Sequence, residues 1–204
     1  TMSILHFNHK TLDLSTPRIM GVLNVTPDSF SDGGRFNSID TALRHADEMI
    51  RWGVDIIDIG GESTRPNAPS VATKTELDRV IPVVQALQAE FGDEVWLSLD
   101  TSNPVVMEQG IHAGADMIND VRGLRRDGAC DMAARLDCPV VIMHSRGEPD
   151  TMTQIMNSLT NYDNVVREVV SELDRDVQNA LNAGVRRENI VIDVGMGFAK
   201  NHAH

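Results

Sequence analysis

The sequence predicts an α/β fold, because short apolar strands alternate with amphipathic helices along most of the chain. Six strand–helix units of similar length follow one another, an order that is typical of a parallel sheet with right-handed crossovers. Polar residues stand at the end of every predicted strand. An open doubly wound sheet gathers its ligand groups at one switch point, whereas a (β/α)8 barrel takes them from all of its strand ends. The pattern therefore favours the barrel.

The chain is expected to form a single domain over residues 1–204. A complete barrel needs eight strands and typically about 250 residues. This chain of 204 residues supplies about six βα units. We therefore expect the last two βα units of a complete barrel to be lacking from this domain.

Hydrophobic spacing predicts each element in turn. Residues 4–14 alternate weakly, as in a short hairpin that precedes the barrel. The predicted strands are short apolar runs, at 19–24, 54–59, 95–99, 115–118, 139–143 and 190–192. The predicted helices carry apolar residues at helical spacing, at 38–52, 75–91, 104–113, 127–136 and 162–183. Ser38 is a candidate cap for the first helix, and Pro82 is a candidate kink in the second.

The composition argues against several classes of partner. The net charge of −12 disfavours nucleic acid, because binding a polyphosphate needs clustered lysine and arginine. No apolar run approaches the length of a membrane span, and no signal pattern stands at the N-terminus. Cys130 and Cys138 lack the spacing of a zinc site or a disulfide framework. Reduced thiols and a cytoplasmic location are therefore expected, with no nucleic acid and no membrane as partner.

Five polar residues at predicted strand ends are the first candidates for a site: Asn24, Asp58, Asp100, Asn119 and Asp193. In a barrel they converge on one mouth, where carboxylates and amides can hold the donor-rich edge of a heterocycle by two hydrogen bonds at once. Any one of them could instead cap a loop or a neighbouring helix. Five in equivalent positions favour a ligand site.

Two further groups could bind an anion. Thr64 and Arg65 lie in a small donor-rich loop behind two glycines, and an arginine in such a loop can hold a phosphate. His144 and Arg146 follow the fifth predicted strand and could do the same, although a lone histidine there is more often a structural hydrogen-bonding group. The sequence contains no Walker loop, no GxSxG elbow and no HExxH motif.

Several strings in the chain together resemble the dihydropteroate synthase family: GVLNVTPDSFSDGG at 21–34, IIDIGGESTRP at 56–66, LSLDTSNP at 97–104, INDVRG at 118–123 and MHSRGEP at 143–149. They occur in order across nearly the whole chain, and the first two are highly specific. The resemblance implies a TIM barrel that joins 6-hydroxymethyl-7,8-dihydropterin diphosphate to 4-aminobenzoate and releases diphosphate. It also implies a transferase of folate biosynthesis that requires Mg²⁺ and is a sulfonamide target, and a homodimer at full length.

The resemblance implies a role for each matched residue. Asn24 would contact Mg²⁺ and the diphosphate, which Arg65 and His144 would help to bind. Asn24, Arg65 and Asp100 would be the catalytic residues. The pterin ring would be held by residues of the strand ends and of the sixth-strand loop: Asp100, Asn119, Met143, Asp193 and Phe198. The 4-aminobenzoate would lie under two mobile loops that contribute Phe30, Thr64, Arg65 and Pro66.

The chain departs from the family pattern in two places. The sixth-strand motif, which in the family is Asp-Pro-Gly-Phe-Gly-Phe-Gly-Lys, reads DVGMGFAK from Asp193 to Lys200, so that a proline and a glycine are lost. The family's later Ser-Arg-Lys and Arg-x-His motifs have no counterpart in the sequence.

Two alternatives to the synthase stay open at this point. A pterin-dependent methyltransferase would share the barrel and the pterin-holding acids, but it would not need the TPDSFSDGG and GGESTRP loops. A non-catalytic pterin-binding fragment would lack the reaction altogether. Release of diphosphate when both substrates are mixed with Mg²⁺ separates the synthase from this non-catalytic protein.

Overall fold

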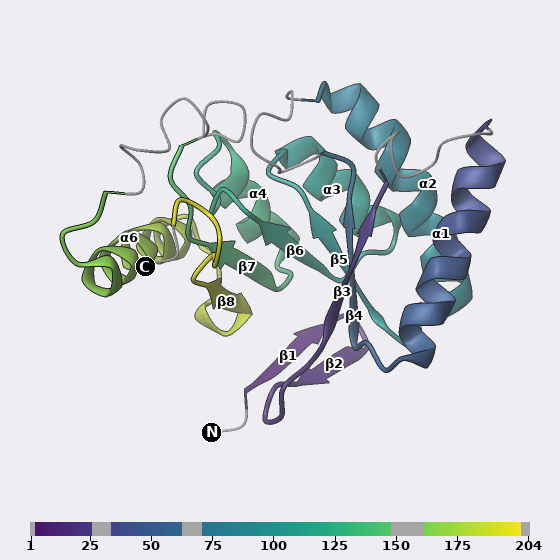
Figure 1. The fold of residues 1–204 in the computed structure, drawn as a ribbon, viewed down its shortest axis with the longest axis horizontal. Coiled ribbons are helices and arrows are strands. Elements are labelled where there is room, and N and C mark those ends of the chain that lie inside the picture. The colour runs from purple at the N-terminus through teal and green to yellow at the C-terminus, as the bar shows by residue number, and fades with distance from the viewer. Residues whose placement is uncertain (1–2, 26–33, 63–70, 148–160, 201–204) are drawn as a thin grey trace.

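A six-stranded parallel sheet forms the centre of the molecule (Figure 1). The computed structural model describes residues 3–25, 34–62, 71–147 and 161–200, and of residues 34–37 only the backbone. The strands pair in chain order: β3 Met20–Asn24, β4 Ile56–Gly60, β5 Trp96–Asp100, β6 Met117–Asp120, β7 Val140–Met143 and β8 Ile190–Asp193. A doubly wound sheet would reverse this order at a switch point. The unbroken order confirms the predicted barrel architecture.

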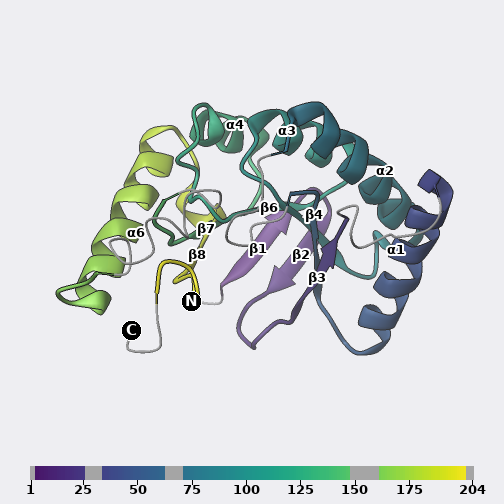
Figure 2. The same cartoon turned by 45° about the horizontal axis from the view of Figure 1, so that its top comes forward.

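The helices of the described part cover the outer, convex side of this sheet, and the inner side holds an N-terminal hairpin (Figure 2). The helices are α1 Gly34–Arg51, α2 Thr73–Phe91, α3 Pro104–Ala113, α4 Ala129–Leu136 and α6 Val165–Asn182, and a short 3-10 helix, η2 Arg187–Asn189, precedes β8. Helices on one side of a parallel sheet are the layer pattern of a (β/α) barrel. No helix among the described residues is long and apolar enough to cross a membrane.

Alternate residues of each strand form the outer core. Side chains along a strand point to opposite faces, so every second apolar residue meets the helices. The outward strand residues are almost fully buried: Leu23, Ile57, Ile59, Leu97, Leu99, Ile118 and Ile142. Their helix partners in the same core include Val80, Val84, Leu87 and Met107.

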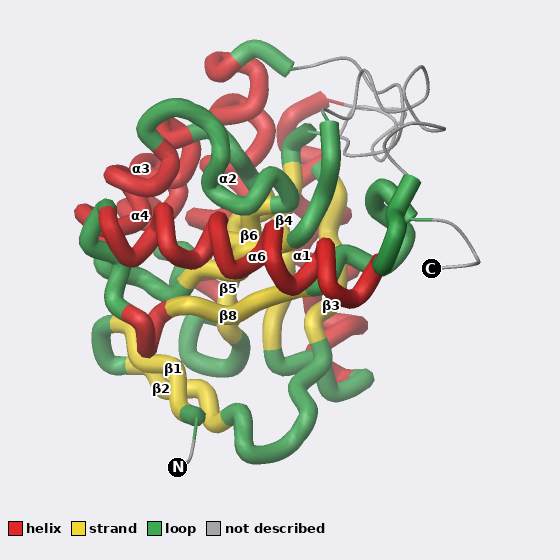
Figure 3. The backbone as a smooth tube through the Cα atoms, turned by 90° about the vertical axis from the view of Figure 1, so that its left-hand side faces the viewer, coloured by secondary structure: helices red, strands yellow, loops and turns green. Residues whose placement is uncertain are grey.

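The antiparallel hairpin of β1 (Ile4–Phe7) and β2 (Lys10–Asp13) fills the inner side at the end where the strands begin. Leu5 and Leu12 pack on inward residues at the strand starts: Ile56, Trp96, Met117 and Val141. Lys10 Nζ lies 2.6 Å from Asp116 Oδ2 and donates to the Val95 carbonyl oxygen at 2.8 Å. Figure 3 shows the hairpin beside η2, where β8 begins. The hairpin expected at residues 4–14 is thus confirmed, as the floor of the barrel.

Several strands end later than the hydrophobic pattern predicts. β5 and β8 end one residue later and β6 two residues later, so that Asp100, Asn119 and Asp193 lie inside strands rather than beyond them. Backbone pairing continues through these polar side chains, as in the pairs Asp100 with Asn119 and Met143 with Asp193. The reason is that backbone amides need hydrogen-bond partners whatever side chain they carry.

Helix boundaries differ in a similar way. α1 begins at Gly34, so Ser38 lies inside the helix and is not its cap. Serine is a favoured cap but is also tolerated within helices, so a cap residue alone does not locate a helix start. Pro82 lies within α2 and does not end it. α6 begins only after Asn164, whose side chain accepts a hydrogen bond from the Arg167 amide at 3.0 Å.

Candidate active site

The register of the sheet stacks the candidate residues in layers on its inner side. Ile56 and Trp96 pair with each other and pack on the hairpin, so they face inward. Residues two and four positions later on a strand face the same way. The layer above the floor holds Asp58, and the next layer holds three further candidates: Asn24, Asp100 and Asn119.

An acid–amide group that is partly buried lies at this mouth. Asn119 Nδ2 donates a hydrogen bond to Asp58 Oδ2 at 2.9 Å, and Asp58 is only 4 % exposed. Asp58 Oδ1 has no hydrogen-bond partner among the described residues. Asp100 lies against Gly60, where a Cβ would come within 3.1 Å of Asp100 Oδ2. The group therefore offers carboxylate and amide acceptors at the carboxyl ends of neighbouring strands.

The acids of this group hold their protons more tightly than ordinary carboxyls. Burial raises the pKa of Asp58, and the neighbouring Ser98 hydroxyl and the hydrogen bond from Asn119 oppose this shift. The pKa of Asp100 lies well above its ordinary value, first because of burial and then because the charges of Asp58, Asp120 and Glu76 repel a further negative charge. A ligand that brings N–H donors would relieve this repulsion, and an anion would increase it.

Asp193 stands on the inner side at the end of β8, next to Met143 of β7 in the register. The Gly195 amide donates to Asp193 Oδ1 at 2.8 Å, so the start of the following loop fixes this carboxylate. Met143 is buried, and Phe198 later in the same loop is half-buried. Two of the predicted pterin contacts, Met143 and Asp193, are therefore neighbours at the mouth, and Phe198 follows in the loop after β8.

The burial and the contacts of the His144 ring argue against direct anion binding by this residue. The side chain has no exposed surface, and both ring nitrogens already have partners at 2.8 Å, Glu172 Oε2 and Lys200 Nζ. Arg146 is likewise paired with Glu168 and Glu172. The predicted diphosphate role of His144 is therefore corrected to a structural one, because its nitrogens are already occupied.

The other predicted groups lie at or beyond the edge of the described chain. Phe30, Thr64, Arg65 and Pro66 fall outside the described residues. Asn24, the last residue of β3, is exposed at the mouth. Among the described residues no group of three or more His, Cys, Asp or Glu could hold a metal ion. The amide oxygen of Asn24 is a hard ligand, and this fits Mg²⁺ when phosphate oxygens and water complete the coordination.

A buried polar layer behind the strand ends was not predicted from the sequence. Thr101 donates to Glu76 Oε1 at 2.6 Å, and Asp120 accepts from the Ser102 hydroxyl and from the amides of Arg122 and Leu124. These side chains sit just outside the site and hold the first turns after β5 and β6. The strings DTSNP and NDVRG did indicate this layer, because in each a polar residue that faces the helices directly follows one that faces the mouth.

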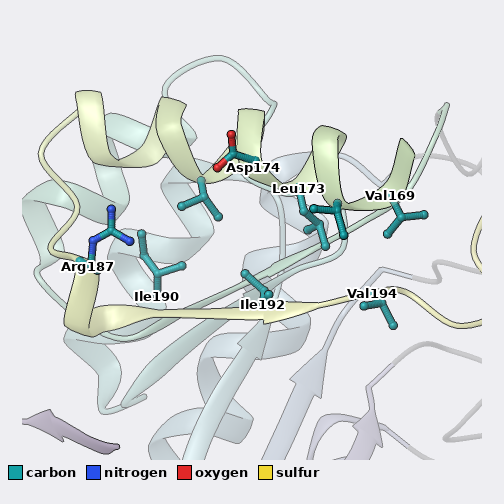
Figure 4. A pocket seen from close by; sticks show the side chains of 9 residues that line it. Val169, Leu173, Asp174, Arg187, Ile190, Ile192 and Val194 are labelled. Atoms are coloured by element: carbon teal, nitrogen blue, oxygen red, sulfur yellow. The ribbon is translucent and has the colours of Figure 1, made fainter. Parts of the chain in front are cut away.

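An apolar groove on the outside of the sheet is unrelated to this chemistry. It lies between α6 and β8, and Figure 4 shows Val169 and Leu173 facing Ile190 and Ile192 across it. Its polar lining residues are Asp174 and Arg187 at the rim. None of the acids or amides of the mouth lines the groove.

Comparison with known proteins identifies the family. Residues 20–204 match the pterin binding enzyme family. The chain is 47 % identical over 200 residues to the dihydropteroate synthase of Haemophilus influenzae, covering 98 % of this chain and 70 % of that protein. A structure of the Xanthomonas albilineans dihydropteroate synthase with 4-aminobenzoic acid has a TM-score of 0.88 at 43 % identity, covering 100 % of this chain and 70 % of that one. The Yersinia pestis dihydropteroate synthase with a sulfonamide drug gives a TM-score of 0.88 at 46 % identity, with 98 % and 71 % covered. The chain belongs to the pterin binding enzymes and, within them, to the dihydropteroate synthase family.

Proposed function

We propose that the chain condenses 6-hydroxymethyl-7,8-dihydropterin diphosphate with 4-aminobenzoate, giving 7,8-dihydropteroate and diphosphate. The observation that carries the proposal is the acid–amide group of Asp58, Asp100 and Asn119 at the carboxyl ends of neighbouring strands, in which Asp58 is buried and the other two are half-buried. A pterin edge presents an amino group and a ring N–H side by side, and neighbouring carboxylate and amide oxygens match that pattern. The 4-aminobenzoic acid and the sulfonamide bound to the relatives support the choice of second substrate.

The pterin would be held as a donor-rich ring. Asp100 and the amide oxygen of Asn119 accept from its N–H groups, and the raised pKa of Asp100 falls back as those donors arrive. Asp193 would bind the pterin ring from the opposite side, and Met143 and Phe198 would pack on the faces of the ring. A ring bound from both sides in this way would direct its methylene carbon out of the mouth, toward Asn24.

The reaction exchanges one bond at that carbon for another. The C–O bond to diphosphate breaks and its electron pair leaves with the diphosphate, while the lone pair of the 4-aminobenzoate amine forms the new C–N bond and the amine then loses a proton. Mg²⁺, when bound, would neutralise charge on the leaving diphosphate. Asn24 would hold the metal and the diphosphate, and Arg65 would add a cation. The 4-aminobenzoate contacts of Phe30, Thr64 and Pro66 stay predictions.

The test is direct measurement of both products. Mixing the two substrates with Mg²⁺ should release diphosphate and form dihydropteroate in equal amounts, and a sulfonamide should inhibit the release. Asp100→Asn should abolish turnover, whereas Asp93→Asn, an exposed acid at the barrel floor, should not change it. Pterin binding without diphosphate release would contradict the synthase and favour a binding protein. Methyl transfer from methyltetrahydrofolate would favour the methyltransferase.

Two broader expectations belong to the same proposal. A cytoplasmic location agrees with the free thiols of Cys130 and Cys138, since burial raises the pKa of Cys138 to about 12 and makes it unreactive. A homodimer is expected at full length. Sedimentation at several protein concentrations tests the dimer.

A further inference from the structure

Lys200 makes three hydrogen bonds with its ammonium group. Nζ lies 2.8 Å from His144 Nδ1, 3.0 Å from the Gly195 carbonyl oxygen and 2.8 Å from the Phe198 carbonyl oxygen. An ammonium has three N–H donors and no acceptor, so all three are used. None of the three acceptors is charged. Lys200 is therefore placed to hold backbone and ring in position rather than to neutralise an acid.

The backbone that Lys200 holds is the loop that fixes Asp193. The Gly195 amide donates to Asp193 Oδ1, and the Phe198 amide donates to the Gly195 carbonyl at 3.0 Å, closing a tight turn. Gly195 has φ +65°, and a Cβ there would come within 2.0 Å of the His144 carbonyl oxygen. The turn therefore packs closely against the end of β7. Lys200 donates to the Gly195 and Phe198 carbonyl oxygens of this turn and so holds it at the same place.

The His144 side of the contact is itself held by further hydrogen bonds and ion pairs. Because Lys200 donates to Nδ1 of His144, the proton of the neutral ring lies on Nε2 and is donated to Glu172 of α6 at 2.8 Å. Arg146 pairs with Glu172 and lies over the ring of Tyr162, 3.9 Å from its centroid. The Tyr162 hydroxyl donates to the Ala199 carbonyl at 2.9 Å. The loop is therefore anchored to β7 and to the segment before α6.

We propose that Lys200 is a positioning residue for pterin binding: it clamps the Gly195–Phe198 turn onto His144 and thereby orients Asp193 and Phe198 toward the ring. The inference rests on the proposed function for its ligand, but the clamp itself is a property of the free protein. Lys200 does not touch the pterin in this arrangement. It acts through the amide of Gly195.

The clamp depends on the charge of Lys200. The pKa of Lys200 is lowered to about 8, chiefly by burial and in part by the charge of Arg146, while Asp193 and Glu172 oppose this shift. The groups that face the ammonium are His144 of the β7 end, Glu172 of α6, Arg146 and Asp193. Above pH 8 the neutral amine has two N–H donors for three acceptors, so one contact is lost. Pterin affinity should therefore fall as the pH rises through about 8.

The first experiment measures 6-hydroxymethylpterin binding by calorimetry between pH 6.5 and 9.5. Lys200→Met should weaken binding about tenfold at pH 7, as expected for loss of charge-assisted hydrogen bonds. The difference from wild type should shrink above pH 8, because wild type then loses the same charge. Lys74→Met, an exposed lysine on α2, is the matched control and should bind like wild type. Asp193→Asn should weaken binding at every pH.

The second experiment needs neither variant nor ligand. The amide resonance of Gly195 and the ring nitrogen resonances of His144 in the wild-type protein should titrate together, with a midpoint near pH 8. Constant resonances from pH 7 to 9 would overturn the clamp, as would wild-type affinity in Lys200→Met together with weakened binding in Asp193→Asn. If wild type does not bind the pterin, the proposed function fails, and the Gly195 titration still decides whether Lys200 holds the loop.

Discussion

The amide nitrogen of Asn119 lies 2.9 Å from Asp58 Oδ2 and donates a hydrogen bond to it. This contact settles which way the amide of Asn119 faces, because its nitrogen side is directed at Asp58. Its oxygen is left as the acceptor on the opposite side. A carboxylate one layer below the mouth thereby orients a side chain in the layer above.

Asp58→Ala should weaken pterin binding roughly tenfold, or about 1.4 kcal/mol, because the Asn119 amide loses the partner that orients it. The variant should still fold, because it removes a carboxyl whose burial is unfavourable. Calorimetry with 6-hydroxymethylpterin is the measurement, and Asp93→Asn is the control. Unchanged affinity in Asp58→Ala would show that Asn119 does not need this orientation.

Asp100→Asn should make the protein more stable at pH 7–8 while abolishing pterin binding. The raised pKa of Asp100 means that the folded state binds this proton more tightly than the unfolded chain does. The resulting stabilisation is complete at low pH and is lost as the pH rises through the folded-state pKa. Asparagine does not titrate, so the free energy of unfolding of the variant should exceed that of wild type at pH 8. This difference should disappear near pH 3.

Thermal melts of wild type and Asp100→Asn at pH 3, 5 and 8 test this sign. For a protein of this size each 1 kcal/mol shifts Tm by about 2–4 °C. Asp127→Asn, a substitution at an exposed acid, is the control variant. A gain of equal size at all three pH values would contradict titration of Asp100 as the cause.

Ala199→Gly should stabilise the protein by about 0.5–1 kcal/mol. Ala199 has φ +50°, in the left-handed region where a Cβ is strained and glycine is not. Ala183→Gly is the matched control: Ala183 has φ −76° at the end of α6, so the same change there should destabilise by about 1 kcal/mol or less. Urea unfolding measures both. Effects of the same sign would mean that Ala199 is not strained.

Lys10→Met should destabilise the protein by about 3–5 kcal/mol, because Asp116 would keep a buried charge without its partner. Adding Asp116→Asn should recover part of the loss, since the neutral amide can still accept from the Leu97 amide. Lys74→Met, which breaks an exposed pair, should change stability by less than about 1 kcal/mol. A double variant as unstable as Lys10→Met would show that the buried charge is not the cause.

The fold and much of the mouth could be predicted from the sequence, because periodicity reports directly on strands. Asp100 and Asn119 end apolar runs, and parallel strands bring such ends to one edge. The depth of Asp58 could not be predicted, since an apolar run does not show which of its residues pairs with which neighbour. Register, set by the whole sheet, places Asp58 two residues below the mouth.

Contacts between residues far apart in the sequence could not be predicted from the hydrophobic pattern. His144 stands at a strand end like the true mouth residues, yet its ring turns outward to Glu172, 28 positions later, and to Lys200, 56 positions later. A motif marks where a residue stands along a strand, and only packing decides what occupies its nitrogens. For the same reason the role of Lys200 could not be predicted, although the motif DVGMGFAK contains this residue.

Asn119 and Asp120 are neighbours on β6 that face opposite sides, one into the mouth and one into the turns that begin the outer helices. A shift of β6 by one residue would exchange them. Asp120 would then stand among the mouth acids, and the turns after β5 and β6 would lose the carboxylate that holds them. Substitutions between Met117 and Asp120 change one function at a time, but an insertion or deletion there would damage the binding site and the scaffold together. We therefore expect changes in length in this part of the chain to be tolerated only in the loops on either side of β6.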